Sequence, residues 1–172
     1  MYNNKSYVPI ATADGSMTLF DHESSLHFRS LRGARSESEY VFFESSGLQQ
    51  HPTPWRVLEL GLGTGLNFLV TAQQALESGV TLDYHVVEAE PIQAALLKQL
   101  NHARFFTSTL CDLLYQAVEA SPPEPGVKAP PPRQFASERI RLTLYHGRWQ
   151  ETVLPADLTV HSIYHDPFGP KD

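Results

Sequence analysis

The glycine-rich turn at residues 61–65 limits the possible folds of this chain more than any other segment. Its sequence is Gly-Leu-Gly-Thr-Gly, and it directly follows an apolar run at 56–60 that is predicted to be a strand. After the turn, apolar residues recur near a 3.6-residue period, which predicts a helix. Strand, glycine turn and helix in this order are typical of an open α/β sheet, in which ligands bind at the carboxyl ends of the strands.

The alternation of strands and helices continues beyond this turn. Further strands are predicted over 81–87, 141–145 and 158–164, and helices from Pro91 to about Asn101 and over 108–120. Residues 121–132 hold 6 of the 13 prolines, which excludes a helix or a central strand there. The pattern predicts a parallel sheet with helices on both faces and an exposed proline-rich insert at 121–135.

The first fifty residues have a different character. Thr18, Phe20 and the run 40–43 carry β-type residues, and turn signals occur at 13–16 and 45–47. We therefore expect two regions: a β-rich extension over 1–54, and an α/β domain over 55–172 that includes the proline-rich insert.

Composition restricts the class of protein. A chain of 172 residues is about one domain in length, and its 13 basic and 19 acidic residues give a net charge of −6. Its apolar runs are too short to span a bilayer, which needs ~20 residues. The first residues lack the basic-then-apolar order of a secretory signal, and a lone Cys111 cannot form an intramolecular disulfide. We expect a cytoplasmic protein with no membrane partner.

The charges are unevenly distributed along the chain. Residues 57–97 contain five acidic side chains and no Lys or Arg, whereas 128–148 contain five basic side chains and one acidic one. A third feature is Arg29, Arg32 and Arg35, spaced by three. These runs indicate either ordinary solvated surface or an acidic pocket flanked by surface that tolerates phosphate.

The residues around the glycine turn favour one class of ligand. The spacing is G-x-G-x-G, and Leu66 occupies the third glycine position of a dinucleotide fingerprint. Glu59 is expected beside the turn, where it would repel a pyrophosphate and attract a sulfonium. Glu88, at the end of the next predicted strand, can accept hydrogen bonds from ribose hydroxyls. Glu90 would replace it if the register shifts by two.

The last predicted strand ends in a second candidate site. Asp166 follows this strand and precedes two prolines that restrict the turn, so its carboxylate is expected to face the same crevice; a simple proline-rich turn is the alternative. His161 and His165 are four residues apart, but no third ligand is fixed by spacing, so no metal site is predicted. Cys111 is expected to be a small core residue.

Three stretches together resemble the MnmC/MnmD tRNA methyltransferase family over roughly residues 7–171. They are 39–44 with Gly47-Leu48, the run 57–69, and 166–171. The resemblance implies a Rossmann-like class I methyltransferase sheet that uses S-adenosylmethionine. It also implies methylation of the amine of 5-aminomethyl-2-thiouridine at the tRNA wobble position, giving 5-methylaminomethyl-2-thiouridine. In fused members an FAD-dependent half exposes that amine, and here such an activity would come from another chain.

The resemblance also assigns site residues. Glu88 would hold the ribose, Asp166 would orient the substrate amine or take its proton, and Trp149 is a candidate cover for the adenine face. Trp149 follows Arg148, where the family usually has an acid. Ser45-Ser46-Gly47 likewise departs from the family's Gly-Asn-Gly. The cofactor loop would comprise Glu59, Gly61, Gly63, Thr64, Gly65 and Asn67.

Family members continue beyond the Asp-x-Phe-x-Pro-Lys motif into a helix and three strands, so we expect a chain truncated at Asp172 that lacks C-terminal strands.

Two alternatives to an active methyltransferase remain open at this point. One alternative is a noncatalytic cofactor-binding fragment whose prolines at 130–132 engage a partner. The other is a nicotinamide-dependent oxidoreductase. Contact of Arg139, Arg141 and Arg148 with RNA is also left open.

Overall fold

The computed structural model describes residues 7–119 and 130–165. The elements of the first half are β1 (Tyr7–Ala11), β2 (Met17–Asp21), β3 (Leu26–His27), α1 (Ala34–Glu37), η1 (Ser38–Phe43), η2 (Glu44–Ser46), η3 (Leu48–Gln50), β4 (Trp55–Leu60) and α2 (Leu66–Glu77). Those of the second half are β5 (Leu82–Glu88), α3 (Ala94–Leu97), η4 (His102–Arg104), α4 (Ser108–Glu119), β6 (Arg133–Ser137), β7 (Ile140–His146) and β8 (Ser162–His165).

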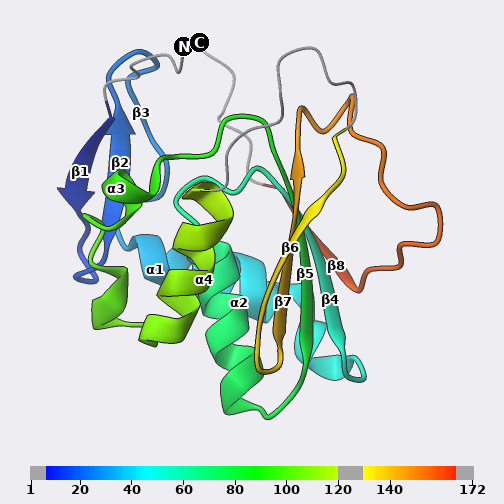
Figure 1. The fold of residues 1–172 in the computed structure, drawn as a ribbon. Coiled ribbons are helices and arrows are strands. Elements are labelled where there is room, and N and C mark those ends of the chain that lie inside the picture. The colour runs from blue at the N-terminus through cyan, green and yellow to red at the C-terminus, as the bar shows by residue number, and fades with distance from the viewer. Residues whose placement is uncertain (1–6, 120–129, 166–172) are drawn as a thin grey trace.

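A five-stranded sheet in the order β6-β7-β5-β4-β8 forms the centre of the molecule (Figure 1). Strands β7, β5, β4 and β8 are parallel, and β6 joins β7 in antiparallel orientation. Parallel strands need crossovers, and α2 supplies the one between β4 and β5. The mostly parallel sheet confirms the predicted α/β fold.

Helices α1, α2 and α4 lie on the same side of this sheet in Figure 1. The prediction of helices on both faces is therefore wrong for the part of the chain that the structure describes. The second face is covered instead by the connection between β7 and β8, whose Leu154 and Val160 pack against buried Leu58, Val87 and Tyr145. The apolar residues of this connection do not recur with the period of a helix, so the sequence does not favour a helix there.

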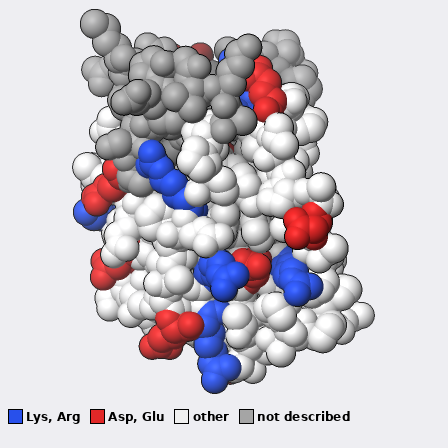
Figure 2. Space-filling model, turned by 45° about the vertical axis from the view of Figure 1, so that its right-hand side comes forward, with Lys and Arg blue, Asp and Glu red and all other residues white. Residues whose placement is uncertain are grey.

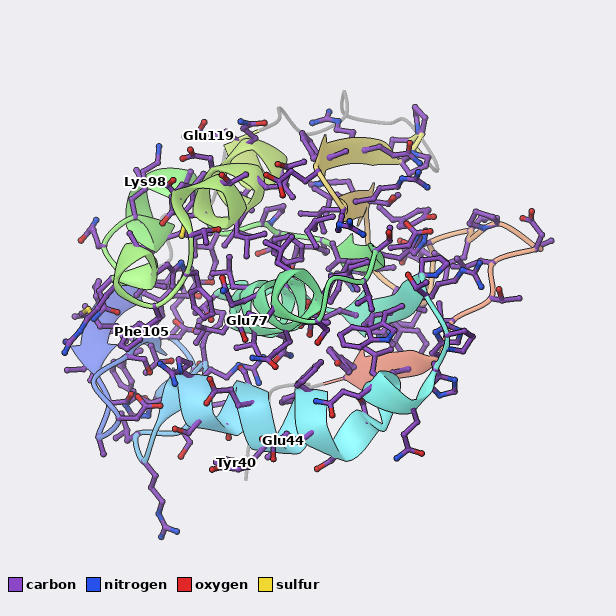
Figure 3. The ribbon with its side chains drawn as sticks, turned by 90° about the horizontal axis from the view of Figure 1, so that it is seen from below. Tyr40, Glu44, Glu77, Lys98, Phe105 and Glu119 are labelled. Carbon is purple, nitrogen blue, oxygen red and sulfur yellow. The ribbon has the colours of Figure 1, made fainter. Side chains whose placement is uncertain are left out.

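The N-terminal region is only partly β-rich. Strands β1, β2 and β3 form an antiparallel sheet, but 40–43, expected as a strand, lie in the helical segment η1. Phe43 is buried against Trp55. Tyr40 is 63% exposed, and its side chain points outward in Figure 3. Burial of neighbouring residues on one side of a helix outweighs their β propensity, which depends strongly on context.

Three other elements differ from the expected boundaries. The helix expected from Pro91 is reduced to α3, because the preceding residues line a pocket and Asn101 adopts a left-handed conformation. Strand β6 occupies part of the expected proline-rich insert, most of which lies outside the described residues. Strand β8 begins only at Ser162.

One large apolar core unites both regions of the chain. Leu19 and Leu48 from the N-terminal region belong to the same buried cluster as Phe68 and Leu114 of the α/β region. Cys111 is buried in this cluster, which confirms its predicted core position. Lys98 and Glu119 tie α3 to the end of α4 at the surface with a 3.0 Å ion pair (Figure 3). Among the described residues, no helix is long and apolar enough to cross a membrane.

Candidate nucleoside-binding site

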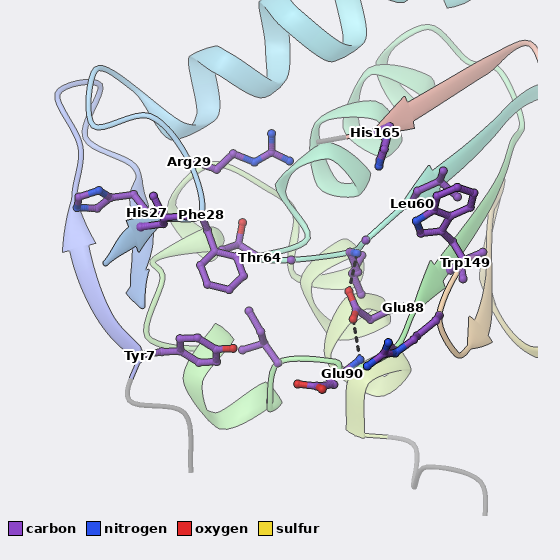
Figure 4. A pocket seen from close by; sticks show the side chains of 18 of the residues that line it. Tyr7, His27, Phe28, Arg29, Leu60, Thr64, Glu88, Glu90, Trp149 and His165 are labelled. Atoms are coloured by element: carbon purple, nitrogen blue, oxygen red, sulfur yellow. Dashed lines mark hydrogen bonds between the residues drawn. The ribbon is translucent and has the colours of Figure 1, made fainter. Parts of the chain in front are cut away.

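A pocket of about 540 Å³ opens where the parallel strands end (Figure 4). Its walls come from the ends of β4, β5 and β8, from the segment after β7, and from the N-terminal region. Small-molecule sites typically have volumes of about 300–1,000 Å³ and occur at this edge of α/β sheets. The lining residues are Tyr7, Leu26, His27, Phe28, Arg29, Ser30, Glu37, Leu60, Gly61, Leu62, Gly63, Thr64, Val87, Glu88, Ala89, Glu90, Ile92, Gly147, Arg148, Trp149, Gln150 and His165.

Glu88 is the last residue of β5 and lines this pocket. Its Oε2 accepts a hydrogen bond from the backbone N–H of Leu62 at 2.8 Å, and its Oε1 accepts one from the N–H of Glu90 at 2.7 Å (Figure 4). Each oxygen of an ionised carboxylate can accept two hydrogen bonds. The two amides therefore fix the carboxylate and leave acceptor capacity for ligand hydroxyls.

The glycine turn forms the floor of the pocket. Gly61, Gly63 and Gly65 all have positive φ, at 91°, 53° and 78°. Gly61 and Gly63 line the pocket together with Thr64, as expected of a turn that a ligand approaches closely. Gly65 has another role, since a Cβ there would lie 2.6 Å from Leu114 Cδ2. The third glycine thus permits the turn to pack against α4.

Glu59 lies beneath the turn and outside the pocket lining. It is 2% exposed, and its carboxylate accepts hydrogen bonds from Asn67 Nδ2 at 2.8 Å and from the Tyr84 hydroxyl at 2.9 Å. Burial raises the pKa of Glu59 to about 7. Glu59 and Asn67 were both predicted to bind the cofactor; in the structure they support the turn from the protein interior.

The segment after β7 forms the wall beside Glu88. Arg148 and Trp149 both line the pocket, and Trp149 is 52% exposed. Its ring lies 6.2 Å from that of His165, the last residue of β8, at an interplanar angle of 65°. The indole therefore has a free area at the pocket edge on which a planar base can stack.

The remaining residues considered in the sequence are Asp166, His161 and His165. Asp166 lies outside the described residues, although His165, which precedes it, lines the pocket. His161 is away from the pocket lining: its ring stacks on His51 at 4.5 Å, and its Nδ1 accepts the Arg56 N–H. Among the residues that the structure describes, no group of three or more His, Cys, Asp or Glu side chains could hold a metal.

The N-terminal wall of the pocket was not predicted. Tyr7, Phe28 and Arg29 close the side opposite β7 (Figure 4), and Glu37 also lines the pocket. The run of arginines that includes Arg29 was expected at the surface, either as ordinary solvated surface or as phosphate-tolerant surface beside an acidic pocket, yet Arg29 is 8% exposed. Nothing local in the sequence indicates this burial, because it depends on the packing of the N-terminal region against the sheet.

No protein-family model matches the chain. It is 34% identical over 161 residues to the tRNA 5-methylaminomethyl-2-thiouridine biosynthesis bifunctional protein MnmC of Acidovorax sp. (strain JS42). The aligned region covers 90% of this chain and 24% of that protein. It is 31% identical over 184 residues to the protein of the same name from Magnetococcus marinus, covering 98% of this chain and 26% of the relative. The chain thus spans about a quarter of the length of these relatives.

A solved structure shares the fold. The crystal structure of MNMC2 from Aquifex aeolicus matches with a TM-score of 0.67 and 21% identity, over 99% of this chain and 52% of that one. The mixed α/β architecture with its mostly parallel sheet is common to both. By sequence, the chain is a relative of the MnmC proteins over about a quarter of their length.

Proposed function

We propose that the chain binds S-adenosylmethionine and transfers its methyl group to the aminomethyl amine of a modified wobble uridine in tRNA. The observation that carries the proposal is the position of the Glu88 carboxylate at the end of β5, where the Leu62 and Glu90 amides hold it. The similarity to MnmC proteins, whose name specifies tRNA 5-methylaminomethyl-2-thiouridine biosynthesis, supports the choice of substrate.

The pocket lining fits the nucleoside part of this cofactor. The remaining acceptor capacity of Glu88 suits the two ribose hydroxyls, and the exposed Trp149 ring suits the adenine. Thr64 Oγ1 is buried in the pocket wall and has no hydrogen-bond partner among the described residues. A buried hydroxyl of this kind is normally satisfied, which supports a polar ligand beside the turn.

The same geometry disfavours a nicotinamide dinucleotide. A pyrophosphate is usually held by free amides of the glycine turn and the helix N-terminus. Here the Leu62 N–H is directed to Glu88, and the Gly65 N–H to the Leu62 carbonyl. Leu66, at the third glycine position, is 1% exposed. The Glu88 carboxylate beside these amides would also repel phosphate.

The reaction needs a neutral substrate amine held in line with the methyl group. When bound, the sulfonium cofactor supplies an electrophilic methyl group. Asp166, which follows the last residue of β8, is our candidate for orienting the amine and accepting its proton. Glu37, Glu88 and Glu90 line the pocket and favour a cationic ligand there.

The tRNA would reach the site across the side that holds β7 and its following segment. Arg139, Arg141 and Arg148 are exposed there, and Arg148 also lines the pocket. Figure 2 shows basic side chains interspersed with acidic ones on this side of the molecule. Arg148 is therefore the favoured phosphate contact, because Arg139 donates to the Gly79 carbonyl and Arg141 lies 3.9 Å from Asp83. An FAD-dependent activity on another chain would prepare the amine.

The test is methyl transfer from labelled S-adenosylmethionine to tRNA that carries the unmethylated aminomethyl group, with fully modified tRNA as the control. We expect label only in the undermethylated tRNA, and at least about tenfold less with Glu88→Ala, since hydrogen bonds to a charged group contribute ~1.5–3 kcal/mol. Equal labelling of both tRNAs, or no labelling, would contradict the proposal. Charge reversal at Arg148 tests the RNA contact: unchanged tRNA affinity would exclude it.

A further inference from the structure

The buried carboxylate beneath the pocket floor has no part in the proposed reaction. Glu59 precedes Leu60 and Gly61, which line the pocket, but Glu59 itself is 2% exposed. Its carboxylate accepts hydrogen bonds from two neutral groups, the Asn67 amide and the Tyr84 hydroxyl, and none of the ion pairs within the described ranges involves it. A carboxylate that is buried without a paired cation favours its neutral, protonated form.

From this position we infer that Glu59 selects the charge of the ligand: its ionised form favours a sulfonium over an uncharged thioether, and binding of the sulfonium releases its proton to solvent. The inference rests on the proposed function and deepens it. S-Adenosylmethionine carries the sulfonium, and S-adenosylhomocysteine, the product of methyl transfer, carries the thioether. In the binding step the carboxylic acid loses only its proton, and the ligand is chemically unchanged.

The glycine turn is the layer between this carboxylate and the pocket. Gly61 and Gly63 contribute only backbone to the pocket floor, so a ligand can approach that floor closely. Burial is the main cause of the raised pKa of Glu59, and two charged residues of the pocket lining modify this pKa: Arg29 lowers it and Glu88 raises it. A positive charge on a bound ligand would act in the same direction as Arg29, through an interior whose effective dielectric constant is ~20 and not 80.

The protonation of Glu59 changes near neutral pH, since burial raises its pKa to about 7. The other titratable groups that face it do not change charge there: burial raises the pKa values of Tyr84 and Tyr164 above their ordinary value, and the Arg29 guanidinium stays charged. A bound cation lowers the pKa of Glu59, so the carboxyl group loses its proton on binding between the two pKa values. The affinity for a sulfonium therefore rises with pH toward 7, and the preference over the thioether rises with it.

The test compares S-adenosylmethionine with S-adenosylhomocysteine, which differ in the charge at sulfur. In calorimetric titrations from about pH 5.5 to about pH 7.5, the ratio of the two affinities should shift about fivefold toward S-adenosylmethionine. Near pH 6.5, roughly the middle of this range, titrations in two buffers of different ionisation enthalpy should show more proton release with S-adenosylmethionine than with S-adenosylhomocysteine. In Glu59→Gln the shift should fall below about twofold, and the difference in proton release should disappear.

Two kinds of control separate Glu59 from other groups. Glu77→Gln removes an exposed carboxylate at the far end of α2 and should keep the full shift. His27 and His165 line the pocket, and histidine side chains can change charge in the same pH range. His27→Gln and His165→Gln, made one at a time, should each keep the larger part of the shift. Loss of the shift in a histidine variant and its persistence in Glu59→Gln would overturn the inference.

The remaining outcomes separate this inference from the proposed function. A ratio of affinities that does not vary with pH, or that varies equally in the unaltered chain and in Glu59→Gln, would overturn the inference and leave the nucleoside site intact. Failure of the unaltered chain to bind either ligand would contradict the proposed function, and this inference with it.

A second variant keeps the test decisive if Glu59→Gln does not fold, judged by circular dichroism. Tyr84→Phe removes one hydrogen bond that stabilises the ionised carboxylate, so the pKa of Glu59 should rise further. The pH at which the preference for S-adenosylmethionine increases should then shift upward. An unchanged pH profile in Tyr84→Phe would overturn the inference.

Discussion

Glu59 and Glu88 stand on neighbouring parallel strands, yet one supports the site and the other lines it. Glu59 pairs in register with Val86 of β5, so Glu88 lies two positions further toward the carboxyl edge. Glu59 is covered by α2 and hydrogen-bonded to Asn67 and Tyr84. Glu88 lies beyond the glycine turn, where two backbone amides hold it in the pocket wall.

The difference shows that a step of two residues along a strand changes the environment of a carboxylate completely. Below the turn, desolvation dominates and raises the pKa of Glu59. Above the turn, backbone donors and solvent surround the Glu88 carboxylate. The turn separates a carboxylate that is buried in the interior from one that lines the pocket, and four predictions follow this division.

Removal of the buried carboxylate should have the largest effect on folding. Glu59→Ala leaves the Tyr84 hydroxyl and Asn67 Nδ2 without their acceptor, and each buried unsatisfied donor costs ~1–3 kcal/mol. We expect a loss of about 4 kcal/mol in the free energy of unfolding, measured by urea denaturation. Glu59→Gln keeps the volume and one acceptor oxygen and should lose clearly less. Equal stability of all three proteins would show that Glu59 does not support the turn.

The turn itself is the next target. Gly65→Ala places a Cβ 2.6 Å from Leu114 Cδ2 at a φ of 78°, so overpacking adds to backbone strain, and we expect a loss of about 3 kcal/mol in stability. Gly79→Ala is the matched control, because Gly79 has a similar φ of 69° but nothing within 4 Å of the added Cβ. It should lose about 1 kcal/mol. Thermal unfolding that ranks the two variants equally would exclude a packing role for Gly65.

The raised pKa of Glu59 predicts a dependence of stability on pH. Its pKa rises from 4.5 in the unfolded chain to about 7 when folded, so the folded state binds more protons between these values. This contribution is fully present below pH 4.5 and is lost as the pH rises through 7. From pH 5 to 8 the difference in unfolding free energy between wild type and Glu59→Gln should change by about 2 kcal/mol.

The contribution of His102 to stability has the opposite pH dependence. For this reason the prediction uses the difference in unfolding free energy between wild type and Glu59→Gln. Burial lowers its pKa from 6.5 to about 4, so it contributes stability that is lost as the pH falls through this range. The wild-type curve alone contains both contributions, and subtraction of the Glu59→Gln curve removes that of His102. Parallel curves for the two proteins would contradict the raised pKa of Glu59.

Glu88, the carboxylate that lines the pocket, should show the reverse balance, with a small effect on stability. Glu88→Gln offers one acceptor oxygen to two backbone amides, and we expect a loss of about 1 kcal/mol in unfolding free energy. Affinity for S-adenosylhomocysteine should fall about tenfold, measured by calorimetry. Glu44→Gln, on the outer side of the helical N-terminal segment, is the control and should change neither quantity (Figure 3). A large loss of stability with unchanged affinity would reverse the roles assigned to the two carboxylates.

The region from β4 to β5 was predictable because its signals are local. The apolar strand, the glycine turn and the amphipathic α2 follow one another without interruption, and the sheet places Glu88 beside the turn. The N-terminal wall was not predictable, because its residues become buried only through contacts with distant segments. Phe43 on Trp55 and Phe42 on Tyr164 keep a β-type sequence helical.

Spacing alone also did not separate the site residues by role. Glu59 and Asn67 belong to the same motif as Gly61 and Thr64, but the strand and helix direct their side chains inward. Arg29 shows the opposite case, since an arginine in a charged run proves to line the pocket. In both cases burial, which depends on the whole fold, decides the role.

The central claim is that the edge of the sheet forms a nucleoside site for S-adenosylmethionine. The most direct measurement is calorimetric titration of the 172-residue chain with S-adenosylmethionine, with NAD titrated in parallel and with Glu88→Ala as the altered protein. We predict saturable binding of S-adenosylmethionine, its loss in Glu88→Ala, and no binding of NAD. Saturable binding of NAD, or S-adenosylmethionine binding that does not depend on Glu88, would contradict the account.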